Sequence, residues 1–250
     1  MDNKKHKEMK QLFELKEGLF MRVFENFKIE FLQNACFTHE SSLEPQYAKT
    51  IVKDTRIENY SGDMLILAMA NNLNVILYHM ILNGYRGVMP TIKTAMQINN
   101  KFCINLFKIC RDEWVDKGDD HYTIDYNSYI YDDERIVLDS MLMQLSKIHN
   151  LDEIVSNAAE LFWFLIFKQP FECFNDIAMC CIINYYLMAN RCMPIVYNCN
   201  EIESLSLKMK EAICTDEWID WVKTYIYEKM EETMMLTKIS LDEISANDTE

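Results

Sequence analysis

The spacing of apolar side chains predicts helices over most of the chain. Five phenylalanines near the start stand seven, four, three and four positions apart, which is the stripe of an amphipathic helix over residues 4–32. They are Phe13, Phe20, Phe24, Phe27 and Phe31. Other apolar segments with helical start and stop signals cover residues 62–83, 90–116, 133–149, 152–168, 175–191 and 215–235. Residues 34–53 are typical of an irregular connection.

One segment follows the two-residue period of a β-strand. Between His121 and Tyr131, apolar and polar residues alternate on both sides of Asn127-Ser128, which is typical of a turn. The alternating residues are Tyr122, Ile124, Tyr126, Tyr129 and Tyr131. The pattern predicts a short β-hairpin, which is either a covered sheet edge or an exposed edge that a partner can extend by one strand.

The composition favours a single helical domain. The chain has 250 residues, half of them apolar, and its 5 glycines and 4 prolines are too few for many short strands. We expect one mostly α domain over residues 1–236, followed by an acidic, disordered tail over residues 237–250.

The cysteines and the apolar runs indicate a cytoplasmic protein. The cysteines number nine, an odd count, and are scattered through apolar segments, which favours a reducing compartment. No signal peptide is evident at the start, and the densest apolar run, Leu161–Phe167, is followed at once by Lys168. We therefore expect no membrane-spanning segment.

The charge limits the kind of partner. The formal net charge of −14 opposes direct binding to nucleic acid and to anionic membranes. Such a surface either serves solubility alone or attracts a basic protein, for example one that itself binds nucleic acid.

No residue pattern predicts a metal site. The five histidines are far apart in the sequence, and the cysteines include no Cys-x-x-Cys pair. Most cysteines are therefore expected in the core, where they act as small apolar side chains. Cys173 differs because it lies beside a predicted helix N-terminus that can lower the pKa of its thiol.

Two apolar helices flank a loop that begins with Pro-Phe. The first ends at Lys168, the loop and helix start span Gln169–Ile177, and the second helix leads to Pro194-Ile195. This arrangement resembles the Fic (Fido) family of AMP-transferring enzymes, whose loop reads His-Pro-Phe-x-Asp/Glu-Gly-Asn-Gly-Arg. The resemblance covers residues 121–195, because the family has a β-hairpin flap and a helix before this unit. It implies a Fic-like helical bundle in which the hairpin over 121–131 is the flap that docks a target.

Only some positions of this motif are matched by the chain. Pro170, Phe171 and Asn175 match, and Glu172 stands at a variable position. The remaining positions differ, in chain order, as follows: Gln169 for the histidine, Cys173 for the Mg²⁺-binding carboxylate, Phe174 and Asp176 for the two glycines, and Ile177 for the arginine.

These differences remove the chemistry that the resemblance implies. Gln169 cannot act as a general base, and the soft thiol of Cys173 is a poor ligand for Mg²⁺. Phe174 is expected to resist the positive φ that glycine adopts, and Asp176 is expected to occupy the helix N-terminus that would receive a phosphate. We expect no cofactor and no metal.

Three interpretations of the function follow. The first is a catalytically inactive Fic-like protein that binds and inhibits or redirects another protein, such as a phage inhibitor or a pathogen effector in the host cytosol. The second is a nucleotide-binding transferase with a rebuilt active site that uses Glu172 or Cys173. The third is a structural oligomer formed by pairing of the hairpin.

The segment His39–Pro45 resembles the family's inhibitory motif only loosely, since Glu40 stands where a hydroxyl residue belongs.

Overall fold

The computed structural model confirms a mostly α fold. It describes residues 3–35, 43–53, 57, 60, 62–103, 132–145, 150–171, 174–212, 215 and 217–247. Within these ranges the secondary structure consists of helices without a strand. The predicted hairpin over residues 121–131 lies outside the described residues.

The N-terminal region consists of three short helices instead of one long helix. They are α1 (Asn3–Leu12), α2 (Glu17–Val23) and α3 (Glu25–Asn34). The prediction of one helix over 4–32 is therefore wrong, although the phenylalanine stripe is buried as expected. The breaks fold the stripe back on itself, so that the Phe20 ring lies 5.0 Å from the Phe13 ring and 4.7 Å from the Tyr85 ring.

A further helix, α4 (Pro45–Val52), lies in the segment that was expected to be irregular. Pro45 stands in its first turn, where the missing N–H and the fixed φ of proline favour a helix start. The expectation of an irregular connection over residues 34–53 is therefore wrong for this part of the chain.

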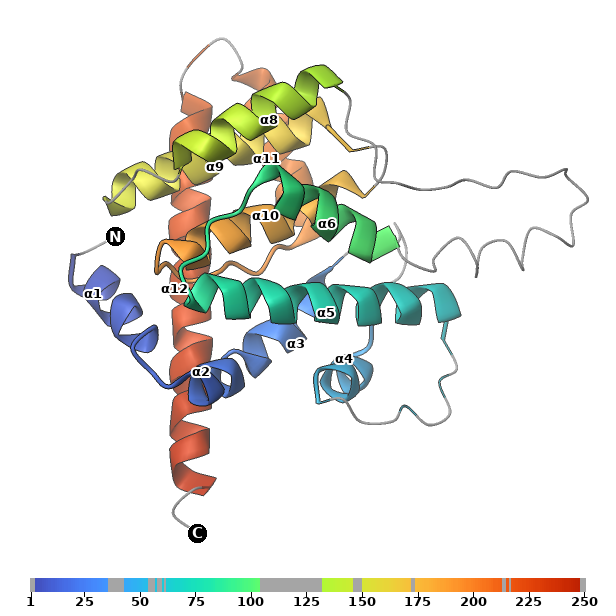
Figure 1. Ribbon diagram of the computed structural model, residues 1–250, viewed down its shortest axis with the longest axis vertical. Coiled ribbons are helices and arrows are strands. Elements are labelled where there is room, and N and C mark those ends of the chain that lie inside the picture. Colours follow the sequence, from blue (N-terminus) through green and yellow to red (C-terminus); the bar gives the residue numbers. More distant parts are fainter. Residues whose placement is uncertain are drawn as a thin grey trace, which may run out of the picture.

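Helix α10 (Asn175–Ala189) is the centre of the protein. Every residue from Ile177 to Met188 is buried, because α10 is surrounded by α5 (Met64–Tyr85), α6 (Ile92–Cys103) and α9 (Leu151–Lys168) (Figure 1). At one point α10 and α5 lie so close that a Cβ on Gly84 would come within 2.5 Å of the Met188 Cβ. Only glycine fits at this contact.

The long helix α12 (Glu217–Asn247) runs along the longest axis of the molecule (Figure 1). It packs against α9 near its start and against α2 and α3 further on. The expected disordered tail from residue 237 is wrong as far as residue 247, because this part of α12 still buries Thr237 and Ser240. The Ser240 hydroxyl accepts a hydrogen bond of 2.8 Å from the Asn26 amide.

Two more helices complete the described fold. Helix α8 (Asp132–Leu145) corresponds to the helix predicted from residue 133, whereas α11 (Cys199–Glu211) was not predicted. By length and composition alone, helix α5 is apolar enough to cross a membrane, although it was not singled out as such from the sequence. However, 44% of its most apolar window is buried inside the protein, where it packs against α10, α6, α4 and α3.

Candidate functional site

Helices α9 and α10 hold the loop that the sequence singles out. Helix α9 begins after Asn150, whose Oδ1 accepts a hydrogen bond of 3.0 Å from the Asp152 N–H, and it ends at Lys168. Gln169 follows in the left-handed region, with φ 44° and ψ 60°, and its side chain is exposed. This residue turns the chain out of α9 and into the loop.

The three residues that match the Fic motif all have structural roles. Pro170 is buried, and Phe171 is only 2% exposed. The Asn175 side chain accepts a hydrogen bond of 2.8 Å from the Phe171 N–H and donates one of 2.7 Å to the Phe171 carbonyl oxygen. Asn175 therefore closes the loop onto the start of α10, and Phe174 is the residue that precedes the helix.

Phe174 adopts a conformation that was not expected of it. It is the residue that precedes α10, and its φ of 55° and ψ of 36° place it in the left-handed region. The expectation that a bulky side chain would prevent a positive φ is therefore wrong. The Phe174 ring packs edge-on against Phe102 of α6, with ring centroids 4.9 Å apart, and this contact offsets part of the backbone strain.

The position where the Fic motif has its arginine is apolar and buried in this chain, as is Cys180 nearby on α10. Ile177 and Cys180 are each 7% exposed and belong to the core cluster around α10. Burial raises the pKa of the Cys180 thiol well above its ordinary value, and the neighbouring Cys181 and Asp176 act in the same direction. The thiol is therefore protonated near neutral pH. Asp176 is exposed in the first turn of α10.

Several predicted site residues lie outside the described residues. They are Glu172, Cys173, the flap residues Tyr122, Ile124, Tyr126, Tyr129 and Tyr131, and His39–Ser42 of the loosely matching inhibitory segment. Their roles stay predictions. Among the residues that the structure does describe, no three His, Cys, Asp or Glu side chains come together as a metal site.

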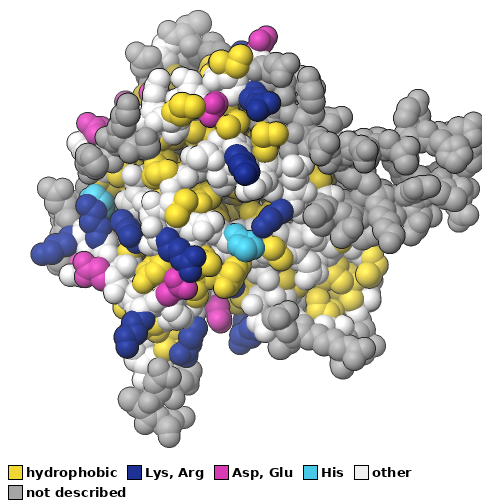
Figure 2. Space-filling model, in the orientation of Figure 1, with side chains coloured by type: hydrophobic (Ala, Val, Ile, Leu, Met, Phe, Trp, Pro, Cys, Tyr) yellow, Lys and Arg dark blue, Asp and Glu magenta, His cyan; other side chains and the backbone are white. Residues whose placement is uncertain are grey.

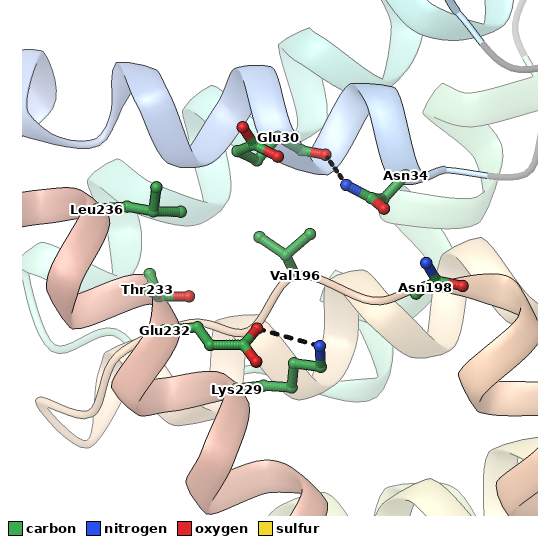
Figure 3. A pocket seen from close by; sticks show the side chains of 8 residues that line it. All are labelled: Glu30, Asn34, Val196, Asn198, Lys229, Glu232, Thr233 and Leu236. Carbon is green, nitrogen blue, oxygen red and sulfur yellow. Dashed lines mark hydrogen bonds and ion pairs between the residues drawn. The ribbon is translucent and has the colours of Figure 1, made fainter.

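The structure also shows features that the sequence did not predict. The buried Asn184 side chain accepts a 2.6 Å hydrogen bond from the Ile195 N–H and donates one of 2.8 Å to the Ile195 carbonyl oxygen. A pocket of about 140 Å³ lies between α3 and α12 (Figure 3), and another of about 200 Å³ lies between α5, α6 and α10. Their lining residues are distant in sequence, so no local pattern could have indicated them.

The overall fold is Fic-like. The chain matches the crystal structure of a Fic domain containing signalling protein from Bacteroides thetaiotaomicron VPI-5482, with a TM-score of 0.65 and 14% sequence identity. The match covers 95% of this chain and 98% of that chain. The sequence matches no model of a known protein family and no curated protein. The structural likeness therefore defines the class of fold, without defining an activity.

Proposed function

We propose that this Fic-fold protein transfers no nucleotide and acts by binding another protein, which it inhibits or redirects. The observation that carries the proposal is the burial of Ile177 in the core, at the position where the Fic motif has its arginine. A phosphate group there would meet an aliphatic side chain instead of a guanidinium that can form two hydrogen bonds to it.

The electrostatics of the helix start support the same conclusion. A helix N-terminus attracts anions through its free N–H groups and its dipole. Here the exposed carboxylate of Asp176 lies in the first turn of α10, where its charge takes the favourable position and repels a phosphate. Because Gln169 stands at the position of the general base, the described residues of the loop supply neither the base nor the positive charge that the Fic motif supplies.

The proposed partner is a basic protein. The net charge of −14 favours a partner of opposite charge, such as a nucleic-acid-binding protein. The negative charge is not spread evenly, since Lys and Arg side chains are prominent among the described residues on the face in Figure 2. The alternating aromatic residues of 121–131 supply the proposed docking strand. We place the protein in the cytoplasm, or in the host cytosol if it is a phage protein or an effector.

Two experiments test this proposal. In the first, the protein is incubated with labelled ATP, Mg²⁺ and a cell lysate. The labelling of lysate proteins should not exceed that of a reaction from which the protein is omitted. Affinity capture should retain a partner with the wild type and with Tyr78→Asp, a control on the exposed surface of α5, and lose it with Tyr126→Asp. Labelling that depends on the chain, or capture that Tyr126→Asp leaves unchanged, would contradict the proposal.

A further inference from the structure

We propose that the pocket between α3 and α12 binds the cationic head group of an Arg or Lys side chain of the partner protein. This inference rests on the proposed function for the source of the cation. The pocket lies apart from the α9–α10 loop, since its walls come from α3, α12 and the segment after α10 (Figure 3). It would therefore give a basic partner an anchoring point separate from the flap.

Carboxylates from two helices line the pocket. Glu30 belongs to α3 and Glu232 to α12, and Figure 3 shows them on opposite sides of the space. The amide of Asn34 donates a hydrogen bond of 2.9 Å to the Glu30 carbonyl oxygen, which ties this part of the wall to the end of α3. The pair of carboxylates favours a ligand that carries positive charge and N–H donors.

The one cationic side chain in the lining is already neutralised. Lys229 lies 3.0 Å from Glu232 and 3.1 Å from Glu201, and its ammonium group stands over the Tyr225 ring. The carboxylates of Glu232 and Glu201 therefore neutralise the charge of Lys229. Glu30 adds a third negative charge. The pocket is thus net negative, which excludes a phosphate or a carboxylate as its ligand.

A buried hydroxyl is aimed at the same space. Thr233 is 0% exposed, and its Oγ1 has no hydrogen-bond partner among the described residues. Figure 3 shows this oxygen directed from α12 toward the pocket. Buried polar groups are nearly always satisfied, so an N–H donor that enters the pocket would supply what Thr233 lacks.

The size and the apolar walls fit an alkyl cation. A volume of about 140 Å³ is far more than one water molecule requires. Val196 and Leu236 face this space and offer contacts for the methylene groups of a long basic side chain. An apolar stem with a cationic head group therefore matches the pocket better than a bare metal ion.

The test uses small probes on the full chain. Ethylguanidinium or butylammonium is titrated while the methyl NMR signals of Val196 and Leu236 are followed. We expect saturable shifts with a Kd on the order of 1 mM, and about tenfold weaker binding of the neutral N-ethylurea.

Glu30→Gln and Glu232→Gln should each weaken probe binding several-fold, and Thr233→Val should weaken it to a lesser degree. Glu228→Gln is the matched control, because it removes the same charge from an exposed position of α12 outside the pocket.

The outcomes separate this inference from the proposed function. Absence of saturable shifts, equal binding of N-ethylurea, or equal affinities of Glu30→Gln and Glu228→Gln would overturn the inference and leave the proposed function standing. Nucleotide transfer by the protein would overturn the proposed function, but it would not change the expected binding of the small cations to the pocket. A captured partner should displace ethylguanidinium. A partner that binds without displacing the probe would show that no side chain of that partner occupies the pocket.

Discussion

The side-chain amide of Asn175 is hydrogen-bonded twice to the backbone of Phe171, four residues earlier, at 2.8 and 2.7 Å. One bond satisfies the Phe171 N–H and the other satisfies its carbonyl oxygen. The match between this loop and the Fic motif is thus a match of folding residues, since Pro170 and Phe171 are buried and Asn175 closes the turn. The matching positions have structural roles, whereas the histidine, the metal-binding carboxylate and the arginine of the motif are replaced.

Asn175→Ala should destabilise the protein by about 1–3 kcal/mol, because it leaves two backbone groups of a buried residue without their partner. Urea unfolding followed by circular dichroism measures the change. Asn71→Ala is the control, since Asn71 is exposed on α5 and its amide bonds only the Leu67 carbonyl oxygen of its own helix. A loss with Asn175→Ala that is no larger than with Asn71→Ala would argue against the clamp.

Restoring the arginine of the motif should damage the fold instead of creating a phosphate site. Ile177→Arg places a charge in a position that is 7% exposed and should lower the free energy of unfolding by about 2–4 kcal/mol. Gln169→His, at an exposed position, should change it by less than about 0.5 kcal/mol. Thermal or urea unfolding of both variants tests the pair, and a fully stable Ile177→Arg protein would show that space for a guanidinium exists.

The strain at Phe174 can be measured by comparing two substitutions. Phe174→Gly and Phe174→Ala both remove the ring contact with Phe102, but only glycine adopts a φ of 55° at no steric cost. The glycine variant should therefore be the more stable of the two by about 1 kcal/mol. The reverse order in equilibrium unfolding would contradict a left-handed conformation at this residue.

The buried cysteines should make the protein sensitive to alkaline pH. Burial raises the pKa of the Cys181 and Cys192 thiols to about 12, from an ordinary value of about 9. Above about pH 9 the unfolded chain loses thiol protons that the folded protein keeps. The free energy of unfolding therefore falls with rising pH, by about 1.4 kcal/mol per pH unit for each thiol, and is unaffected by these groups below pH 8.

Urea unfolding at pH 8, 9 and 10 in the presence of a reductant tests this dependence. The Cys181→Ala variant is the control, because its stability should fall less steeply over the same range even if it is less stable at pH 8. Equal stability of the wild type at pH 8 and pH 10 would contradict the burial of these thiols.

The sequence predicted the helices whose apolar pattern and end signals agree. Helices α9 and α10 appear within two residues of the predicted bounds, because Asn150 caps the first and the second is apolar over its whole length. The predicted helix bounds were wrong where tertiary packing determines where a helix begins or ends. The breaks at Phe24 and after Leu12 bring the phenylalanine stripe against α5, where Phe20 contacts Tyr85. The last turns of α12 are held by the hydrogen bond from Asn26 of α3 to Ser240 and by the burial of Thr237, whose hydroxyl donates a hydrogen bond to the Met234 carbonyl oxygen of its own helix.

The loop illustrates what a motif can and cannot predict. Pro170, Phe171 and Asn175 match the motif in the sequence, but the roles of Asn175 and Phe174 in the turn depend on backbone geometry that the sequence does not specify. The pocket at Glu30 and Glu232 joins positions about 200 residues apart, so only the folded chain brings them together. The β-hairpin structure of the flap and the roles of Glu172 and Cys173 stay predictions.

Calorimetric titration of the purified protein with ATP, with and without Mg²⁺, is the sharpest test of whether the α9–α10 loop has lost its nucleotide site. We expect no binding tighter than a Kd of about 1 mM under either condition, because the helix start carries Asp176 and the arginine position is filled by buried Ile177. Micromolar binding that requires Mg²⁺ would contradict the account and would favour a rebuilt active site that uses Glu172 or Cys173.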